Sequence, residues 1–252
     1  MIQEKIDKKI INKFKKKGWI KIDKFVSKNH LSQIHHLINA FLNKNIRSYS
    51  PRHINFVGKK KILRNINSFH KLNDCLEVKK LSKKKIIKSH VNALLNTKKI
   101  KLRQSEYFAK PKGSGLPVPN HQDNFYWNVV GGNALTVWIA LSKSNIKNGA
   151  IHYYEGTHKY GILKHIPSYA KGSSQKIKNV NFLKKFKKVT PKLDIGDALI
   201  HHSLIAHGSK ANTSNTSRKG ITFQFIEKES KLDFKKIKEY EKQLYKQIKQ
   251  RK

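Results

Sequence analysis

The amino-acid sequence predicts a mainly β fold with flanking helices, of the antiparallel sandwich or jelly-roll type. Between about residues 99 and 227, short alternating or apolar runs are separated by clusters of Gly, Asn, Pro and Ser, as in KLRQSEYFAK, ALTVWIALS and GITFQFIE. This pattern is typical of antiparallel β proteins. The segments before and after this region are charged instead, and their apolar residues recur every three or four positions, which indicates amphipathic helices.

The first part of the chain, residues 1–98, is expected to be largely helical. Residues from about Ile2 to Lys16 predict a basic amphipathic helix, and a short strand is expected at Trp19–Ile22. Ser27 is a suitable N-cap for a second helix through LSQIHHLINAFLNK, where apolar residues recur at intervals of three and four. The stretch Leu72–Leu95 has the same helical pattern.

The predicted β-barrel core spans residues 99–227, and a charged C-terminal helix is expected over residues 231–252. Within the core, the basic segment at residues 171–192 is expected to form a long loop of the barrel, or to order over a substrate. No internal repeat and no Pro- or Ser-rich linker divides the sequence. The sequence therefore predicts a single domain over residues 1–252.

Cysteine content and hydropathy bear on the cellular location. Cys75 is the single cysteine, so no disulfide can form within the chain, which suits a reducing cytoplasm. The N-terminal residues are charged and lack the apolar core of a secretory signal. No apolar stretch reaches the roughly 18 to 20 residues that a membrane span needs. We therefore expect a cytoplasmic protein without a membrane span.

The formal net charge of +40 at pH 7 is extreme. Such a charge favours acidic partners, among them nucleic acid, a membrane surface or a phosphorylated compound. The lysines are nevertheless spread over the whole chain, and Asn and Ile are also abundant, so compositional drift is the simpler explanation. Proteins with a nucleic-acid-binding motif usually localise their charge. The charge alone does not identify a partner, and nucleic acid stays open as a less favoured one.

The sequence HQD at residues 121–123, followed far downstream by His207, carries the strongest chemical signal. In a strand, residues i and i+2 point to the same side, so His121 and Asp123 are expected to face one mouth of the barrel. A second imidazole from a distant strand would complete a face of two nitrogens and one oxygen, the arrangement of non-haem Fe(II) oxygenases. An HxD motif alone is weak evidence, because such pairs arise readily by chance.

Arg218 strengthens this interpretation. It lies eleven positions after His207, and a following strand would carry it to the same cavity. A guanidinium group offers a bidentate fork to a carboxylate, such as the distal carboxylate of 2-oxoglutarate. The alternative is a surface arginine in a basic protein.

Four stretches together resemble the phytanoyl-CoA dioxygenase family, within the wider Fe(II)/2-oxoglutarate-dependent oxygenases. They occur in the family's order and span about half of the chain: RQSEYFAKPKGSG, PNHQDNFYW, ALTVWIALSKSNIKNGAIHYYEGTHKYG and LDIGDALIHHSLIAHGSKANTSNTSRKG. The resemblance implies a double-stranded β-helix, a jelly-roll or cupin-like barrel, in agreement with the strand pattern.

The resemblance also implies the residues of the site and their cofactors, Fe(II) and 2-oxoglutarate. The implied iron ligands, which are also the catalytic residues, are His121, Asp123 and His207. The residues implied around 2-oxoglutarate are Arg218 and Ser209 on its distal carboxylate, Gln104 and Lys110 beside it, and Trp138 as a wall of the pocket.

The implied activity is that of a dioxygenase that hydroxylates an unidentified small molecule with O2 and releases succinate and CO2. Related halogenases replace the carboxylate ligand by a small residue. Because Asp123 is a carboxylate, we expect hydroxylation or a related oxidation rather than halogenation. The basic surface favours an anionic substrate.

Other histidines compete for the site. His201 and His202 are alternatives to His207, but the HGS context and the spacing to Arg218 favour His207, and His202 is expected to be packed or to support a ligand. Because His152 and Tyr153 alternate along a strand, one of them is expected to face the cavity. Turn positions are expected for His158, Asp194 and Asp197.

Two other classes of protein are also open. A catalytically inactive basic barrel would bind nucleic acid or another polyanion, and steeply salt-dependent binding without iron uptake would identify it. A metal-dependent isomerase or cupin-like hydrolase on a similar barrel would need no 2-oxoglutarate, and it would leave Arg218 without a role.

Overall fold

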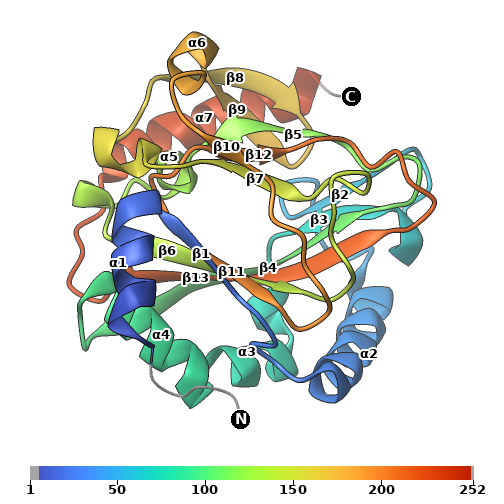
Figure 1. Ribbon diagram of the computed structural model, residues 1–252. Coiled ribbons are helices and arrows are strands. Elements are labelled where there is room, and N and C mark those ends of the chain that lie inside the picture. Colours follow the sequence, from blue (N-terminus) through green and yellow to red (C-terminus); the bar gives the residue numbers. More distant parts are fainter. Residues whose placement is uncertain (1–5, 251–252) are drawn as a thin grey trace.

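Two antiparallel sheets that face each other form the centre of the molecule in the computed structural model, which describes residues 6–250 (Figure 1). Within these residues the larger sheet has seven strands in the order β1-β11-β6-β13-β4-β3-β2. Its strands are β1 (Trp19–Ile22), β2 (Ile54–Phe56), β3 (Ile66–Phe69), β4 (Ile100–Lys110), β6 (Ala134–Ala140), β11 (Ala198–His202) and β13 (Arg218–Glu227).

The smaller sheet lies over the inner face of the larger one (Figure 1). In the described part of the chain it has four strands in the order β10-β7-β12-β5. These are β5 (Val118–His121), β7 (Ile151–Tyr154), β10 (Lys188–Val189) and β12 (His207–Ser209). A hairpin of β8 (His165–Ala170) and β9 (Ser173–Ile177) packs beside β5. The predicted mainly β jelly roll with flanking helices is thereby confirmed.

Helices α2 (Lys28–Asn45), α3 (Leu76–Ser82) and α4 (Lys85–Leu95) cover the outer face of the larger sheet (Figure 1). Their apolar residues recur at helical spacing, as with Ile87 and Val91 of α4, and they pack against apolar residues of the strands. In β13 the alternation is clear, because Ile221 and Phe223 belong to this core while Thr222 lines the cavity between the sheets. One face of the larger sheet therefore packs in the apolar core against the helices, and the other face lines the cavity.

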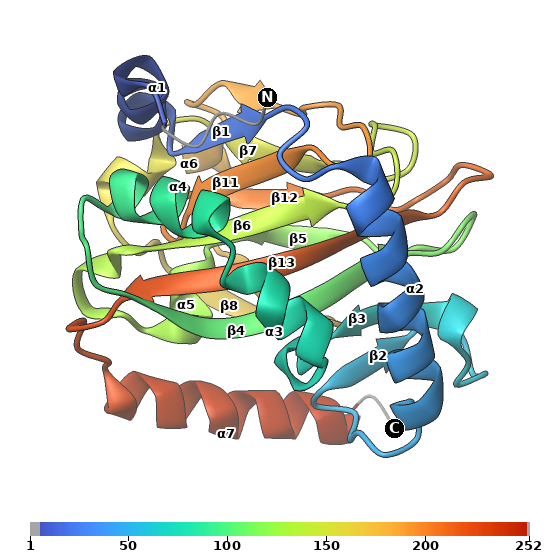
Figure 2. The ribbon, with the colours of Figure 1, turned by 90° about the horizontal axis from the view of Figure 1, so that it is seen from below.

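The remaining helical elements are α1 (Lys8–Lys17), α5 (Asp123–Trp127), α6 (Val180–Leu183), α7 (Phe234–Gln250) and the short 3-10 turns η1 (Leu63–Asn65), η2 (Leu72–Asp74), η3 (Val130–Gly132) and η4 (Thr157–Tyr160). Figure 2 shows α7 running along one side of the two sheets. The predicted terminal helices correspond to α1 and α7, apart from residues 2–5 and 251–252, which lie outside the described residues. No helix within residues 6–250 is long and apolar enough to cross a membrane.

Two expectations about the elements were wrong, and a third was confirmed with a break in it. The N-terminal part is less helical than predicted, because β2 and β3 also lie in it and β3 pairs with β4. The helical pattern predicted over Leu72–Leu95 is confirmed, as η2, α3 and α4, with the extended backbone of Lys84 between α3 and α4. The segment at residues 171–192 is not a long loop, because it contains β9, α6 and β10, and β9 is held by its pairing with β8.

Strands from the N-terminal part join both sides of the larger sheet. β1 pairs with β11, and β3 pairs with β4. Because strands of the N-terminal part and strands of the barrel core pair within one sheet, we propose that residues 1–252 form one domain. A single cooperative unfolding transition, coincident by fluorescence and circular dichroism, would support this proposal, and two separate transitions would contradict it.

Gly196 has a conformation that no other residue type fits well. Its φ is +95°, and an added Cβ would lie 2.3 Å from the carbonyl oxygen of Val26, which is backbone and cannot move aside. We predict that Gly196→Ala lowers the free energy of unfolding by about 3 kcal/mol or more, from left-handed strain and overpacking together. Urea unfolding would measure this. Gly113→Ala is the matched control, because Gly113 also has a positive φ but has open space around it, so its loss should be about 1–2 kcal/mol.

Candidate metal centre

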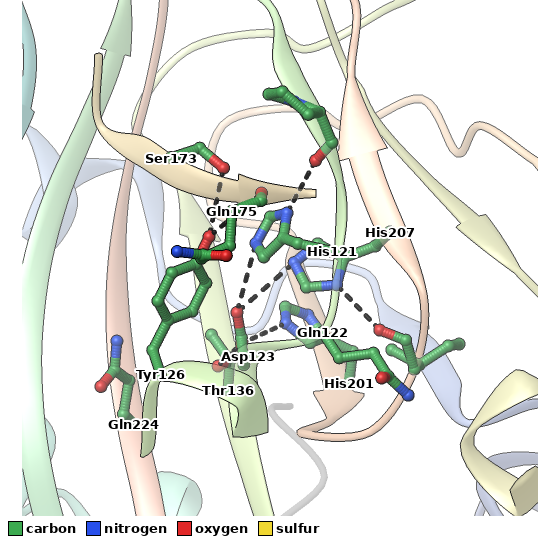
Figure 3. A network of polar contacts seen from close by, with 12 residues as sticks. His121, Gln122, Asp123, Tyr126, Thr136, Ser173, Gln175, His201, His207 and Gln224 are labelled. Atoms are coloured by element: carbon green, nitrogen blue, oxygen red, sulfur yellow. Dashed lines mark hydrogen bonds and ion pairs between the residues drawn. The ribbon is translucent and has the colours of Figure 1, made fainter. Parts of the chain in front are cut away.

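His121, Asp123 and His207 converge on one point between the sheets (Figure 3). One potential ligand atom from each lies within 4.8 Å of the others. The Nε2 atoms of His121 and His207 are both 3.6 Å from Oδ1 of Asp123. The two histidines face each other because β5 and β12 pair with His121 opposite His207. Residues far apart in the sequence are thus brought together by strand pairing.

Asp123 reaches this point differently from the prediction. His121 ends β5, but Asp123 is the first residue of α5, so the two are not alternate residues of one strand. Gln122 has an extended backbone and is the N-cap, after which the chain turns into the helix. The side chain of Gln122 holds this turn by donating to the carbonyl oxygen of Leu204. The convergence of the two ligands was predicted correctly, and its backbone geometry was not.

The Nδ1 atom of each imidazole, on the side of the ring away from Asp123, is hydrogen-bonded to a backbone carbonyl oxygen. Nδ1 of His121 lies 2.8 Å from the oxygen of Pro119, and Nδ1 of His207 lies 3.0 Å from the oxygen of Ile205. Because a carbonyl oxygen only accepts, each Nδ1 carries the proton. In the neutral ring, Nε2 then presents a lone pair toward Asp123, as a metal ligand must.

The two oxygens of Asp123 have different surroundings. Oδ2 accepts a hydrogen bond of 2.7 Å from the hydroxyl of Thr136 and lies 3.1 Å from Nε2 of His201 (Figure 3). The other nitrogen of His201 lies 3.0 Å from the hydroxyl of Tyr153. These contacts fix the carboxylate and leave Oδ1 directed at the two histidines. His201 is therefore a support for Asp123, a role that the sequence did not indicate.

Electrostatics favour the ligand states of these groups. Burial raises the pKa of Asp123, but the neighbouring His207, His121 and His201 outweigh it, so that this pKa lies well below its usual value. Burial, assisted by the nearby His121, holds the pKa of His207 well below its usual value. These directions favour an ionised Asp123 carboxylate and a neutral His207 imidazole. A set of two imidazole nitrogens and one carboxylate oxygen fits Fe(II) with open positions for other ligands.

The centre opens into a cavity of about 340 Å³ between the sheets, within the usual range for small-molecule sites. Arg218, at the start of β13, lines it and is only 3% exposed. Its Nε and Nη2 donate to the carbonyl oxygen of Gly149 at 3.3 and 3.1 Å, and its guanidinium lies 5.2 Å from the ring centroid of Trp138. Ser209, at the end of β12, also lines the cavity.

Lys110 is a second buried basic residue beside Arg218. The two residues are paired across β4 and β13, and Nζ of Lys110 donates to the carbonyl oxygen of Leu116. Burial, and then the charge of Arg218, lower the pKa of Lys110 to about 6, and burial lowers the pKa of Arg218 to about 10. Among the described residues, neither has an acidic partner. A buried guanidinium without a counterion, next to a buried basic side chain, forms a site for an anion.

Gln104 also lines the cavity, but its amide is already engaged. Its Nε2 donates to Oε1 of Glu106 at 2.8 Å, and it pairs with Gln224 across β4 and β13. A role for Gln104 beside the cosubstrate stays a prediction.

Unlike His201, the histidines His202 and His152 do not line the cavity. Nδ1 of His202 accepts from the amide of Leu204, and its ring packs near those of Phe14 and His158. His152 lies 2.7 Å from the side-chain oxygen of Asn120. Asp197 accepts from the backbone amides of Lys24 and Asp194, as expected for a turn residue.

Thr136→Val tests the support of Asp123. The substitution keeps the shape of the side chain but removes the hydroxyl that donates to Oδ2. We predict that the Kd for Fe(II) rises about 10-fold, since partners that orient a metal ligand usually contribute 10- to 100-fold to affinity. Anaerobic titration with Fe(II) would measure it. Thr213→Val, at an exposed position, is the control, and equal affinities of the two variants would contradict the prediction.

The sequence profile of the phytanoyl-CoA dioxygenase family matches residues 14–220. Among curated proteins, the chain is 32% identical over 134 residues to phytanoyl-CoA dioxygenase domain-containing protein 1 of Danio rerio, covering 50% of this chain and 45% of that protein. It is 27% identical over 124 residues to phytanoyl-CoA dioxygenase of Arabidopsis thaliana, covering 49% and 44%. The chain thus spans about half the length of the curated relatives that it matches.

Solved structures share the fold. EctD from S. alaskensis with bound Fe has a TM-score of 0.74 at 17% identity, covering 90% of this chain and 79% of that chain. The non-haem alpha-ketoglutarate-dependent carbocyclase SnoK from nogalamycin biosynthesis has a TM-score of 0.73 at 16% identity, covering 92% and 88%. These matches confirm the predicted double-stranded β-helix.

Proposed function

The chain belongs to the phytanoyl-CoA dioxygenase family, and we propose from this premise that it is an Fe(II)- and 2-oxoglutarate-dependent dioxygenase. In the proposed reaction it hydroxylates a small molecule with O2 and releases succinate and CO2. The observation that carries the proposal is the convergence of His121, Asp123 and His207, with two Nε2 lone pairs and one carboxylate oxygen directed at one point. That donor set is typical of this class of oxygenase.

Each part of the site has a task in this proposal. His121, Asp123 and His207 would hold Fe(II), which when bound supplies the activation of O2. Arg218 and Ser209 would bind the distal carboxylate of 2-oxoglutarate, with Lys110 and Gln104 beside it and Trp138 as a wall. The buried position of Arg218 supports this assignment, because an arginine without an acidic partner is costly to bury unless a ligand compensates it.

The protein itself contributes orientation and exclusion of water. Thr136 and His201 hold Asp123 in one orientation, so the ligand set is organised before the iron arrives. The cavity is enclosed by the two sheets and by α7, whose Tyr240 and Leu244 line it. The basic lining of the cavity supports an anionic group on the substrate, and the intact carboxylate of Asp123 supports hydroxylation rather than halogenation.

The proposal is tested by loading the protein with Fe(II) without oxygen, adding 2-oxoglutarate and recording the visible spectrum. Chelation of 2-oxoglutarate to the iron is expected to give a weak charge-transfer band. Admission of O2 should then produce succinate, even slowly without a substrate. Iron binding without the band would favour the metal-dependent isomerase or hydrolase. Failure to bind iron would contradict the proposal and favour the basic polyanion-binding barrel that the charge suggests.

A further inference from the structure

A polar cluster of residues from β4 and β13 lines the cavity, and the proposed function assigns no task to its charged members. Its centre is Glu106 of β4, which is 8% exposed. Among the described residues that line the cavity, Glu106 and Asp123 are the acidic ones. Oε1 of Glu106 lies 2.7 Å from Nδ1 of His70, and it accepts from Gln104. Oε2 accepts from Gln224 at 2.7 Å.

Arg103 is the cationic member of the cluster. Its Nη1 donates to Oε1 of Gln224 at 2.7 Å, and its guanidinium lies 5.4 Å from the ring centroid of Trp127. Within the described residues these are its polar contacts, and no acidic side chain pairs with it directly. Four of its five N–H groups are therefore free to bind a ligand. The side-chain amide of Gln224 lies between Arg103 and Glu106. Its oxygen accepts from Arg103, and its nitrogen donates to Glu106.

A β-bulge brings Arg103 into the cavity. β4 and β13 pair regularly down to Gln104 and Gln224, but the next pair is Leu102 with Phe225, so Arg103 is an extra residue on β4. Leu102 packs against the outer core, while Arg103 and Gln104 both line the cavity. In an unbroken strand two neighbouring residues would face opposite sides, and bulges commonly redirect side chains at sites. The bulge thus directs the guanidinium of Arg103 into the cavity.

Thr222 points independently to a ligand. It is 3% exposed and lines the cavity, and its hydroxyl is buried without a hydrogen-bond partner among the described groups. It pairs directly with Glu106 across β13 and β4. A buried hydroxyl without a partner costs free energy, so a ligand group is expected to satisfy it.

The cluster adjoins the metal centre. Gln224 pairs with Thr136 across β13 and β6, and the hydroxyl of Thr136 donates to Asp123. Figure 3 shows Gln224 and Tyr126 on the same side of Asp123. Neighbouring strands are roughly 4.8 Å apart. A molecule held by Arg103 and Glu106 would therefore lie next to the iron ligands.

We propose that Arg103, Glu106 and Thr222 form the substrate subsite, and that the substrate is a small zwitterion of the amino-acid type. Arg103 binds its carboxylate through the free side of the guanidinium. Glu106 and Thr222 accept hydrogen bonds from its ammonium group. A purely anionic substrate would place a negative group beside the carboxylate of Glu106, and a purely cationic one would leave Arg103 without an acidic partner. The inference rests on the proposed function in so far as the bound molecule is the substrate.

The test uses matched ligands on the protein loaded with Fe(II) and 2-oxoglutarate, without oxygen. The probes are the common L-amino acids, their amides, which lack the carboxylate, and their N-acetyl derivatives, which lack the ammonium charge. Isothermal titration calorimetry measures their affinities. We expect one or more amino acids to bind, and the corresponding amide and N-acetyl derivative to bind on the order of 10- to 100-fold more weakly, as for lost charge-assisted contacts.

Variants assign each contact to its ligand group. Glu106→Gln should weaken binding of the amino acid by a similar factor but leave the N-acetyl derivative almost unchanged. Arg103→Gln should weaken the amino acid and leave the amide almost unchanged. Glu229→Gln and Arg64→Gln remove the same charges at exposed positions and should change neither affinity. Unchanged thermal transitions and charge-transfer bands would show that the variants are folded.

The outcomes separate this inference from the proposed function. A normal charge-transfer band with no binding of any amino acid, or with equal binding of amino acids and both derivatives, would overturn the zwitterion subsite alone. Absence of the band would contradict the proposed function, and amino-acid binding that depends on Arg103 and Glu106 would then still support the subsite.

Discussion

Replacing Asp123 by alanine is expected to abolish the binding of Fe(II) at micromolar concentrations and all iron-dependent turnover of 2-oxoglutarate. Oδ1 of Asp123 is the one carboxylate oxygen directed at Nε2 of both His121 and His207. Partners that merely orient a ligand contribute about 10- to 100-fold to metal affinity, so removal of the ligand itself should cost more than about 100-fold. Anaerobic titration with Fe(II), followed by measurement of succinate in air, checks both expectations.

The same substitution at an exposed aspartate provides the control. Asp194→Ala removes a carboxylate from a turn that lies outside the cavity, and it should leave iron binding and succinate production unchanged. Loss of Asp123 also leaves His201 and Thr136 without their acceptor, so the folding of the variant must be verified by its thermal transition. Iron binding by Asp123→Ala within about 10-fold of the wild type would refute the assigned ligand set.

Much of the fold could be predicted because its signals are local. The strands β4, β6, β11 and β13 have continuous alternating or apolar patterns, and their pairing follows from the jelly-roll arrangement. β2 and β3, of three and four residues, were missed because their strand state depends on tertiary pairing, of β2 with β3 and of β3 with β4. The same holds for β9 within the basic segment, which its pairing with β8 turns from an expected loop into a strand.

The parts of the site that the sequence could not predict depend on contacts between distant residues. His201 was recognised as a competing histidine, but its contact with Asp123 joins residues 78 positions apart. The direction of Arg103 depends on a bulge that reverses the alternation of β4, and no residue type at that position signals it. By contrast, the spacing from His207 to Arg218 was informative, because it carries the chain from β12 to the start of β13.

Replacement of Arg218 by glutamine is expected to weaken the binding of 2-oxoglutarate by roughly 100- to 1000-fold, since loss of one partner of a buried charge pair costs about 2–5 kcal/mol. Arg218 is buried, and the proposed role gives its guanidinium the distal carboxylate as a partner. Titration of the charge-transfer band in the protein loaded with Fe(II) measures the affinity. Arg218→Lys keeps the charge without the bidentate fork, so an intermediate loss is expected.

Pyruvate distinguishes this role from a general effect on the site, because it retains the 2-oxo acid group but lacks the distal carboxylate. The wild type should bind 2-oxoglutarate far more tightly than pyruvate, and Arg218→Gln should lose most of this preference while its affinity for pyruvate stays nearly constant. Equal losses for both acids would instead indicate a disturbed metal centre, in which Arg218 serves the packing of Trp138 and Gly149. Preference for 2-oxoglutarate that persists in Arg218→Gln would indicate that Lys110, the buried lysine beside Arg218, binds the distal carboxylate.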